Sequence, residues 1–234
     1  MQLITGGGSF SDLFFFVKEK TWPYWVEQKL QPNSVHHVGF SSQGNGLISR
    51  RVLHTVQRNL KEDTLVCIMW SGPTRAEYYV DNNFNEQEGN WGSGGRQIKY
   101  IDSSPGIWAI MNHSWTKYNS PPPFAHPDEL VDKCIAHYTH FYDPIFDALK
   151  TFEHIIRTQH YLQVNNIPYV FMTYTEEVFN HSDHVECKWL LEQLDTDAVI
   201  PESCHEWSLN ESNLPMRDEW YTRGDTHPTE AQYK

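Results

Sequence analysis

The sequence predicts an α/β fold in which helices cover a mainly parallel sheet. Short apolar segments alternate along the chain with longer segments whose apolar residues recur at helical spacing. Residues 64–70, TLVCIMW, are almost entirely apolar, as expected for a strand buried on both faces of a parallel sheet. The chain has 234 residues, which is long enough for one domain with a substantial core. We therefore expect a single domain over residues 1–234.

Each predicted element follows from a local pattern. Short apolar runs predict core strands, and they cover residues 3–5, 34–40, 64–70 and 169–173, with a short fifth strand at 198–200. Apolar residues at helical spacing predict helices, and these cover residues 22–30, 47–60, 128–164 and 188–194. Pro23 suits a first helical turn, and Pro144 predicts a bend or break in the long helix.

The regular alternation stops between residues 81 and 124. This segment contains NWGSGG, SSPG and PPP, which are typical of turns and loops. It also contains scattered aromatic residues that favour order, among them Phe84, Trp91, Tyr100, Trp108, Trp115 and Tyr118. Long loops inside compact domains are usually functional or disordered. We therefore predict an irregular, aromatic-rich insertion that forms an ordered lid.

Charge and hydropathy exclude several classes of protein. The formal net charge of −12 argues against a general nucleic-acid binder, which needs a basic surface. Most of this charge, a net −10, falls between residues 176 and 219. No apolar run approaches the ~20 residues of a membrane span, and the start MQLITGGGSF does not resemble a secretory signal. We expect a cytoplasmic protein with reduced thiols that binds neither nucleic acid nor membrane.

Small and polar residues follow the predicted strands. Gly7-Gly8-Ser9 follows the first strand, Ser41 to Asn45 follows the second, and Ser71 to Arg75 follows the third. Ligand sites in open α/β sheets form beyond the carboxyl ends of the strands, so these segments are expected to share one site. Near the end of the chain, GDTHP supplies Asp225 and His227. A serine, an aspartate and a histidine are the residues of nucleophilic acyl transfer.

The spacing of these residues assigns their roles. Asp225 and His227 are two residues apart, so both side chains can face one pocket from an extended segment or a turn. His227 would accept the proton of Ser9, and Asp225 would orient the imidazole and stabilise its protonated form. The glycines before Ser9 leave its hydroxyl exposed and its backbone N–H near the developing oxyanion.

Four segments together resemble the SGNH (GDSL-type) hydrolases. GGSFSD is similar to the first block of that family, FSSQGNG to the second and GDTHPTEAQ to the last, while VCIMWSGPTR stands in the place of the third. The resemblance implies a three-layer flavodoxin-like fold and ester chemistry without a metal or other cofactor. It places the nucleophile on Ser9, an oxyanion donor on the Gly44 N–H, with Ser42 as the competing alignment, and the other triad members on Asp225 and His227.

The sequence departs from the family pattern at three positions. Gly8 replaces the aspartate of GDS, and the last block reads Asp-x-His where Asp-x-x-His is common. The third block has no asparagine, so the usual amide donor to the oxyanion is missing. Ser71 is the first candidate to replace it, and Asn45 is another. Loss of one such donor typically costs about 10²–10³ in rate.

Other residues carry weaker hypotheses. Arg75 and Trp70 are candidates for substrate binding, since both stand at the end of the third strand and a guanidinium binds carboxylates or phosphates. His181, His184 and Cys187 have helical spacing that would suit a metal, but a helix start is the better interpretation. The insertion aromatics suggest an acetylated carbohydrate as the ester. A non-catalytic glycan- or protein-binding module and an acyltransferase are the alternative functions.

Overall fold

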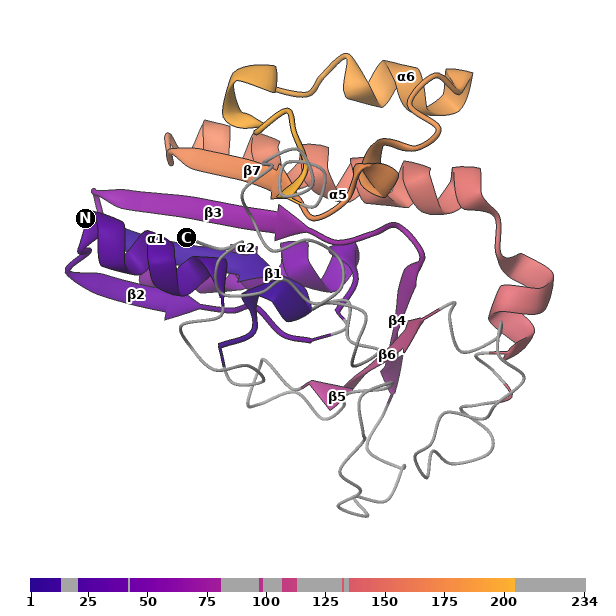
Figure 1. Ribbon diagram of the computed structural model, residues 1–234, viewed down its shortest axis with the longest axis horizontal. Coiled ribbons are helices and arrows are strands. Elements are labelled where there is room, and N and C mark those ends of the chain that lie inside the picture. The colour runs from indigo at the N-terminus through magenta and orange to yellow at the C-terminus, as the bar shows by residue number, and fades with distance from the viewer. Residues whose placement is uncertain are drawn as a thin grey trace, which may run out of the picture.

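The computed structural model describes residues 1–13, 21–41, 43–80, 97–98, 107–112, 132 and 135–204. Its main sheet contains four parallel strands in the order β2-β1-β3-β7 (Figure 1). The strands are β1 Gln2–Gly7, β2 Ser34–His37, β3 Thr64–Trp70 and β7 Tyr169–Thr173. The predicted parallel sheet is confirmed. β2 ends earlier than expected, at His37, and the predicted fifth strand is reduced to one bridge between Phe171 and Val199.

The helices follow the predicted pattern, with differences at their ends. They are α1 Trp22–Leu30, α2 Asn45–Asn59, α5 Pro144–Val164 and α6 Val185–Leu191. Short 3₁₀ turns cover Ser9–Ser11, Glu176–Phe179 and Thr196–Ala198, and a π-helical turn covers His137–Phe141. None of the helices in these ranges combines the length and apolar character needed to cross a membrane.

Pro144 begins a helix instead of bending one. The Asp143 side chain accepts hydrogen bonds from the backbone N–H groups of Ile145 and Phe146, both at 2.9 Å. The proline ring lacks an N–H and has a helical φ, so it suits the first helical position. Of the two possibilities that the sequence left open at Pro144, a bend and a break, the structure shows the break, because an aspartate cap and a proline together form a helix start.

The sheet carries a hydrophobic core on each face, which gives three layers. Alternate residues of each strand point to opposite faces, so Ile68 and Trp70 of β3 belong to one core, and Cys67 and Met69 belong to the other. The larger core packs the sheet against α2, α5 and α6, and the smaller one packs it against α1. The expected α/β layered architecture, with helices on both faces of a parallel sheet, is thus confirmed.

A second sheet corrects the expected irregular insertion. β4 Arg75–Val80, β6 Ile107–Asn112 and β5 Gln97–Ile98 form an antiparallel sheet in the order β4-β6-β5. This sheet lies beyond the carboxyl ends of the parallel strands (Figure 1). The 81–124 insertion therefore contains two strands, β5 and β6. β6 pairs with β4, which lies just before the insertion in the sequence. The remaining insertion residues lie outside the described ranges.

Candidate active site

The order of the strands locates the candidate site. The chain passes from β1 outward to β2 and returns to β3 on the other side of β1, so the winding direction reverses between β1 and β3. In open α/β sheets, ligands bind in the crevice at this switch point, outside the carboxyl ends of the strands. Ser9 stands two residues after the end of β1, and Ser71 directly follows β3. Two of the predicted site residues therefore stand on the two sides of the crevice.

Ser9 begins a short 3₁₀ turn that is hydrogen-bonded to the loop after β2. The three residues of the turn, Ser9–Ser11, are buried, and the Asp12 N–H donates to the Ser9 carbonyl at 3.1 Å. The Asp12 carboxylate accepts a hydrogen bond from the Ser41 N–H at 2.7 Å. The turn that carries Ser9 and the loop after β2 are thereby held at a fixed separation.

Gln43 makes a second link that the sequence did not reveal. Its side-chain amide donates to the carbonyl of Gly7 at 2.5 Å, and its side-chain oxygen accepts from Arg51 at 3.0 Å. The residue is completely buried. Its place inside the FSSQGNG segment was the one available signal, since the segment was already assigned to the site. Gln43 fixes the end of β1 relative to the loop that leads into α2.

The Glu77 carboxylate lies against Gly44. Glu77, on β4, places this carboxylate at the start of α2, where it accepts from the Leu47 N–H at 3.0 Å. Burial is the main cause that raises the pKa of Glu77. A Cβ on Gly44 would lie 2.6 Å from Glu77 Oε1 and 2.8 Å from the Arg75 carbonyl, so glycine is needed for this close approach.

Asn45 binds the backbone of Ser71 instead of facing open space. Its Nδ2 donates to the Ser71 carbonyl at 2.8 Å and to the Thr151 hydroxyl at 3.2 Å. Its Oδ1 accepts from the Ser71 N–H at 2.8 Å. Both amide hydrogens are therefore engaged, and an amide has only two to donate. The structure thus places Asn45 as a clamp on the end of β3, and it leaves the Ser71 hydroxyl beside the crevice.

Arg75 lies directly against the turn that carries Ser9. A Cβ added to Gly8 would lie 2.9 Å from Arg75 Nη1 and 3.5 Å from Ser71 Oγ. Arg75 also donates to the Gln43 carbonyl at 3.3 Å. Burial lowers the pKa of Arg75, and the charges of Tyr138 and Glu77 oppose this effect. Gly8 is therefore a glycine next to a cation, at the position where the family pattern has an aspartate.

Two cavities adjoin these residues, and Arg75 lines both. One, of about 220 Å³, is lined by Gly8, Ser71, Arg75, Tyr174 and Glu177 among others. The other, of about 310 Å³, includes Asn45, Glu77 and His154. Trp70 borders the first cavity, but its ring belongs to the larger core and packs edge to face on Phe171, with centroids 5.4 Å apart. The described space is thus large enough for a small acyl group.

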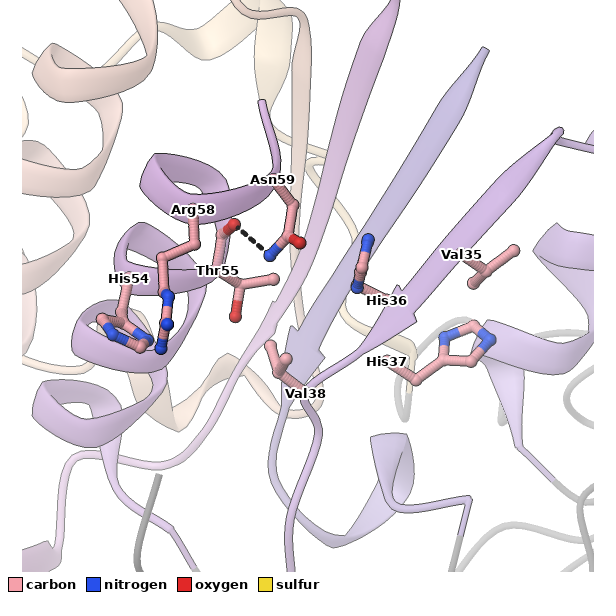
Figure 2. A pocket seen from close by; sticks show the side chains of 8 residues that line it. All are labelled: Val35, His36, His37, Val38, His54, Thr55, Arg58 and Asn59. Atoms are coloured by element: carbon pink, nitrogen blue, oxygen red, sulfur yellow. Dashed lines mark hydrogen bonds between the residues drawn. The ribbon is translucent and has the colours of Figure 1, made fainter. Parts of the chain in front are cut away.

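A third cavity, of about 690 Å³, is lined by none of the predicted site residues (Figure 2). It lies between β2 and the second half of α2, beside His36, His54 and Arg58. The imidazole of His37 lies on the other side of β2, where it is 2.6 Å from the Thr5 hydroxyl and 3.0 Å from the Glu27 carboxylate. This hydroxyl, imidazole and carboxylate repeat the composition of a triad. However, Thr5 is fully buried in β1, so the arrangement serves the packing of β2 and α1.

Several predicted residues lie outside the described ranges. Asp225 and His227 are among them, as are Ser42 and most of the aromatic insertion. Within the described part of the chain, no three His, Cys, Asp or Glu side chains form a metal-binding group. His184 instead caps α6 by accepting from the Glu186 N–H at 3.3 Å, and Cys187 is buried in the larger core. The helix-start interpretation of this segment is confirmed.

Comparison with known proteins adds a similarity of shape. No family model and no curated protein matches the sequence. Among solved structures, the chain is similar to a proposed lipolytic protein of the G-D-S-L family from Desulfitobacterium hafniense DCB-2. The two are 11% identical, with a TM-score of 0.48, over 100% of this chain and 93% of that one.

Proposed function

We propose that this chain is a serine ester hydrolase that cleaves O-acyl esters through an acyl-enzyme on Ser9. The observation that supports this most is that Gly8 and Phe10, the two neighbours of Ser9 in the chain, and Ser71 line one cavity of about 220 Å³ at the switch point of the sheet. The turn that carries Ser9 is fixed by buried hydrogen bonds, and a fixed nucleophile is what acyl transfer requires.

The proposed reaction has two stages. The Ser9 oxygen bonds to the carbonyl carbon of the ester, its proton passes to His227, and the π electron pair moves onto the carbonyl oxygen. That pair then re-forms the carbonyl as the bond to the alcohol breaks, and the alcohol oxygen takes the proton from His227. Water repeats the sequence on the acyl-enzyme and releases the acid. Asp225 orients the imidazole, and the Ser9 N–H and the Ser71 hydroxyl donate to the oxyanion.

The position of Asn45 and Gly44 gives them a different part in this proposal. Both were candidates for donation to the oxyanion, but the Asn45 amide is engaged by Ser71 and Thr151, and the Glu77 carboxylate lies against Gly44. We assign them positioning roles: Asn45 holds Ser71, and Gly44 allows Glu77 to reach the start of α2.

Replacement of the nucleophile tests the proposal. We expect Ser9→Ala to abolish turnover of p-nitrophenyl acetate, while Ser34→Ala, a serine at the start of β2, leaves it unchanged. A fluorophosphonate should add its mass to the wild-type protein and to Ser34→Ala, but not to Ser9→Ala. Equal turnover by the wild type and Ser9→Ala would refute the hydrolase.

The substrate class is the finer part of the proposal. The net −10 between residues 176 and 219 disfavours strongly anionic substrates, and the insertion aromatics favour sugar rings. We therefore propose a neutral acyl ester, with acetylated carbohydrates as the class to screen first. Release of acetate from acetylated sugars supports it. Transfer of the acyl group to an added sugar would show an acyltransferase, and glycan binding without turnover would show a binding module.

A further inference from the structure

The guanidinium of Arg75 occupies an unusual place for a cation. It lies 2.9 Å from the position of a Cβ on Gly8, the residue before the proposed nucleophile, and the Ser71 hydroxyl is 3.5 Å from the same point. Arg75 also begins β4, so its position is set by the antiparallel sheet. It therefore adjoins the backbone on which the ester carbonyl must be placed for attack by Ser9.

The charge of Arg75 is not paired within the described residues. No carboxylate there lies within 4.0 Å of its guanidinium, and its one hydrogen bond, at 3.3 Å, goes to the neutral carbonyl of Gln43. The nearest acid on the same strand, Glu77, accepts from the start of α2 and lies 3.9 Å from Arg50. A guanidinium has five N–H donors, and the hydrogen bond to Gln43 uses one of them. Arg75 lines both neighbouring cavities, so its remaining donors border the space that substrate would enter.

The donors that remain for an oxyanion are few. The third block lacks its asparagine, the Asn45 amide is used on Ser71 and Thr151, and the Glu77 carboxylate lies against Gly44. The Ser9 N–H and the Ser71 hydroxyl are left. Two neutral donors can form an oxyanion hole, and a fixed cation beside them would add a direct charge interaction with the developing oxyanion.

We propose that Arg75 is a catalytic residue that donates an N–H to the oxyanion formed when Ser9 attacks the ester. This inference rests on the proposed hydrolase function. As the Ser9 oxygen bonds to the carbonyl carbon, the π electron pair moves to the carbonyl oxygen, and the guanidinium donates a hydrogen bond to it without losing its proton. When the carbonyl re-forms and the alcohol leaves, the charge is discharged and the hydrogen bond weakens.

The partial burial of Arg75 fits this role. Burial lowers the pKa of the group, but a guanidinium remains protonated in proteins, so its charge is available at neutral pH. A cation held in place by the protein needs no rearrangement when the oxyanion forms, which is the basis of electrostatic preorganisation.

The test compares Arg75→Ala and Arg75→Lys with the wild type on p-nitrophenyl acetate. We expect Arg75→Ala to lower kcat by about 10²–10³, the usual effect of removing one oxyanion donor, with KM changed less than about threefold. Added guanidinium ion should restore part of the lost kcat. Arg75→Lys keeps the positive charge but lacks the planar guanidinium, so its kcat should lie between those of Arg75→Ala and the wild type. Arg58→Ala, an exposed cation beside the cavity of Figure 2, is the matched control and should be unchanged.

A matched pair of substrates separates this role from a structural one. A thionoester has a sulfur that accepts hydrogen bonds weakly, so the rate ratio of ester to thionoester should fall in Arg75→Ala if the guanidinium donates to that atom. Circular dichroism identifies variants that do not fold, and Arg75→Lys then carries the test. An unchanged kcat or an unchanged ratio in a folded variant would overturn the inference.

A second pair of substrates separates oxyanion donation from anion recognition. If Arg75 instead binds an acidic group of the substrate, Arg75→Ala should lose activity on p-nitrophenyl hydrogen succinate and keep it on p-nitrophenyl acetate, which overturns the catalytic role. The proposed hydrolase function has a separate test. It fails if the wild type and Ser9→Ala turn over p-nitrophenyl acetate at the same rate, whatever the Arg75 variants show.

Discussion

The hydrogen bonds between Asn45 and Ser71 make a strong prediction for Asn45→Ala. Asn45 spans the space between the start of α2 and the end of β3, and it is 4% exposed, while Ser71 is 7% and Thr151 is 3% exposed. The substitution removes three hydrogen bonds at 2.8, 2.8 and 3.2 Å and supplies no replacement. A backbone N–H, a backbone carbonyl and a hydroxyl then lose their partner.

The magnitude follows from these groups. A typical intramolecular hydrogen bond contributes about 1 kcal/mol net, so three contribute about 3 kcal/mol. Water from the adjacent cavity of about 220 Å³ can reach Ser71 and reduce the loss. We therefore expect the free energy of unfolding to fall by about 2–3 kcal/mol. Turnover should fall as well, since the Ser71 hydroxyl is no longer held.

Urea unfolding followed by tryptophan fluorescence measures this change. Asn59→Ala is the matched control, because Asn59 ends the same helix and makes one described hydrogen bond, to the Thr55 carbonyl at 2.9 Å. It should cost at most about 1 kcal/mol. Equal losses in the two variants, with unchanged slopes against urea, would refute the idea that Asn45 is a clamp.

Three further predictions concern burial, pH and close approach. Trp22→Phe removes the 2.8 Å hydrogen bond from the indole to the buried Ser11 hydroxyl, and should lower the free energy of unfolding by about 1–2 kcal/mol in urea. Burial, and to a smaller extent neighbouring cations, lower the pKa of His154 from 6.5 to about 4. Between these two pH values His154 is protonated in the unfolded state but not in the native state, so the free energy of unfolding falls as the pH drops from about 6.5 to about 4. His154→Gln should flatten that fall in urea titrations at several pH values, whereas the exposed His160→Gln should keep it. Gly44→Ala places a Cβ 2.8 Å from a backbone carbonyl, and a thermal melt should show a loss of about 1–3 kcal/mol, while an unchanged midpoint would contradict the geometry.

The parallel sheet could be predicted because its strands are nearly continuous apolar runs. TLVCIMW and YVFMT contribute buried residues to both faces of the main sheet. TLVCIMW is its central strand β3, and YVFMT is its edge strand β7. β4, RAEYYV, was missed because its residues mix charge with aromatic character. Its strand conformation depends on pairing with Ile107–Asn112, which is distant in the sequence. Two adjacent tyrosines and a valine were the available signal for a strand.

The site could be predicted in part, for a related physical reason. The order of elements implies that segments after β1, β2 and β3 converge, so Ser9, Gly44 and Ser71 could be grouped from the sequence. The side chains that fix them, Gln43 and Glu77, could not be assigned roles, because hydrogen bonds between distant segments leave no periodicity in the sequence. The same reason explains why Asn45 suggested a donor to substrate, whereas its partner is the backbone of β3.

The short strand β4 has a consequence for how this protein can be altered. Arg75 and Glu77 are two residues apart and so share one side of the strand, with Arg75 against the Ser9 turn and Glu77 at the start of α2. Their register is set by the pairing of β4 with β6, which belongs to the insertion. Exchanging or excising that insertion would therefore withdraw two charged side chains from the crevice, even if the cut were made well away from it. Libraries that vary the insertion should keep Arg75–Val80 and Ile107–Asn112 as a unit.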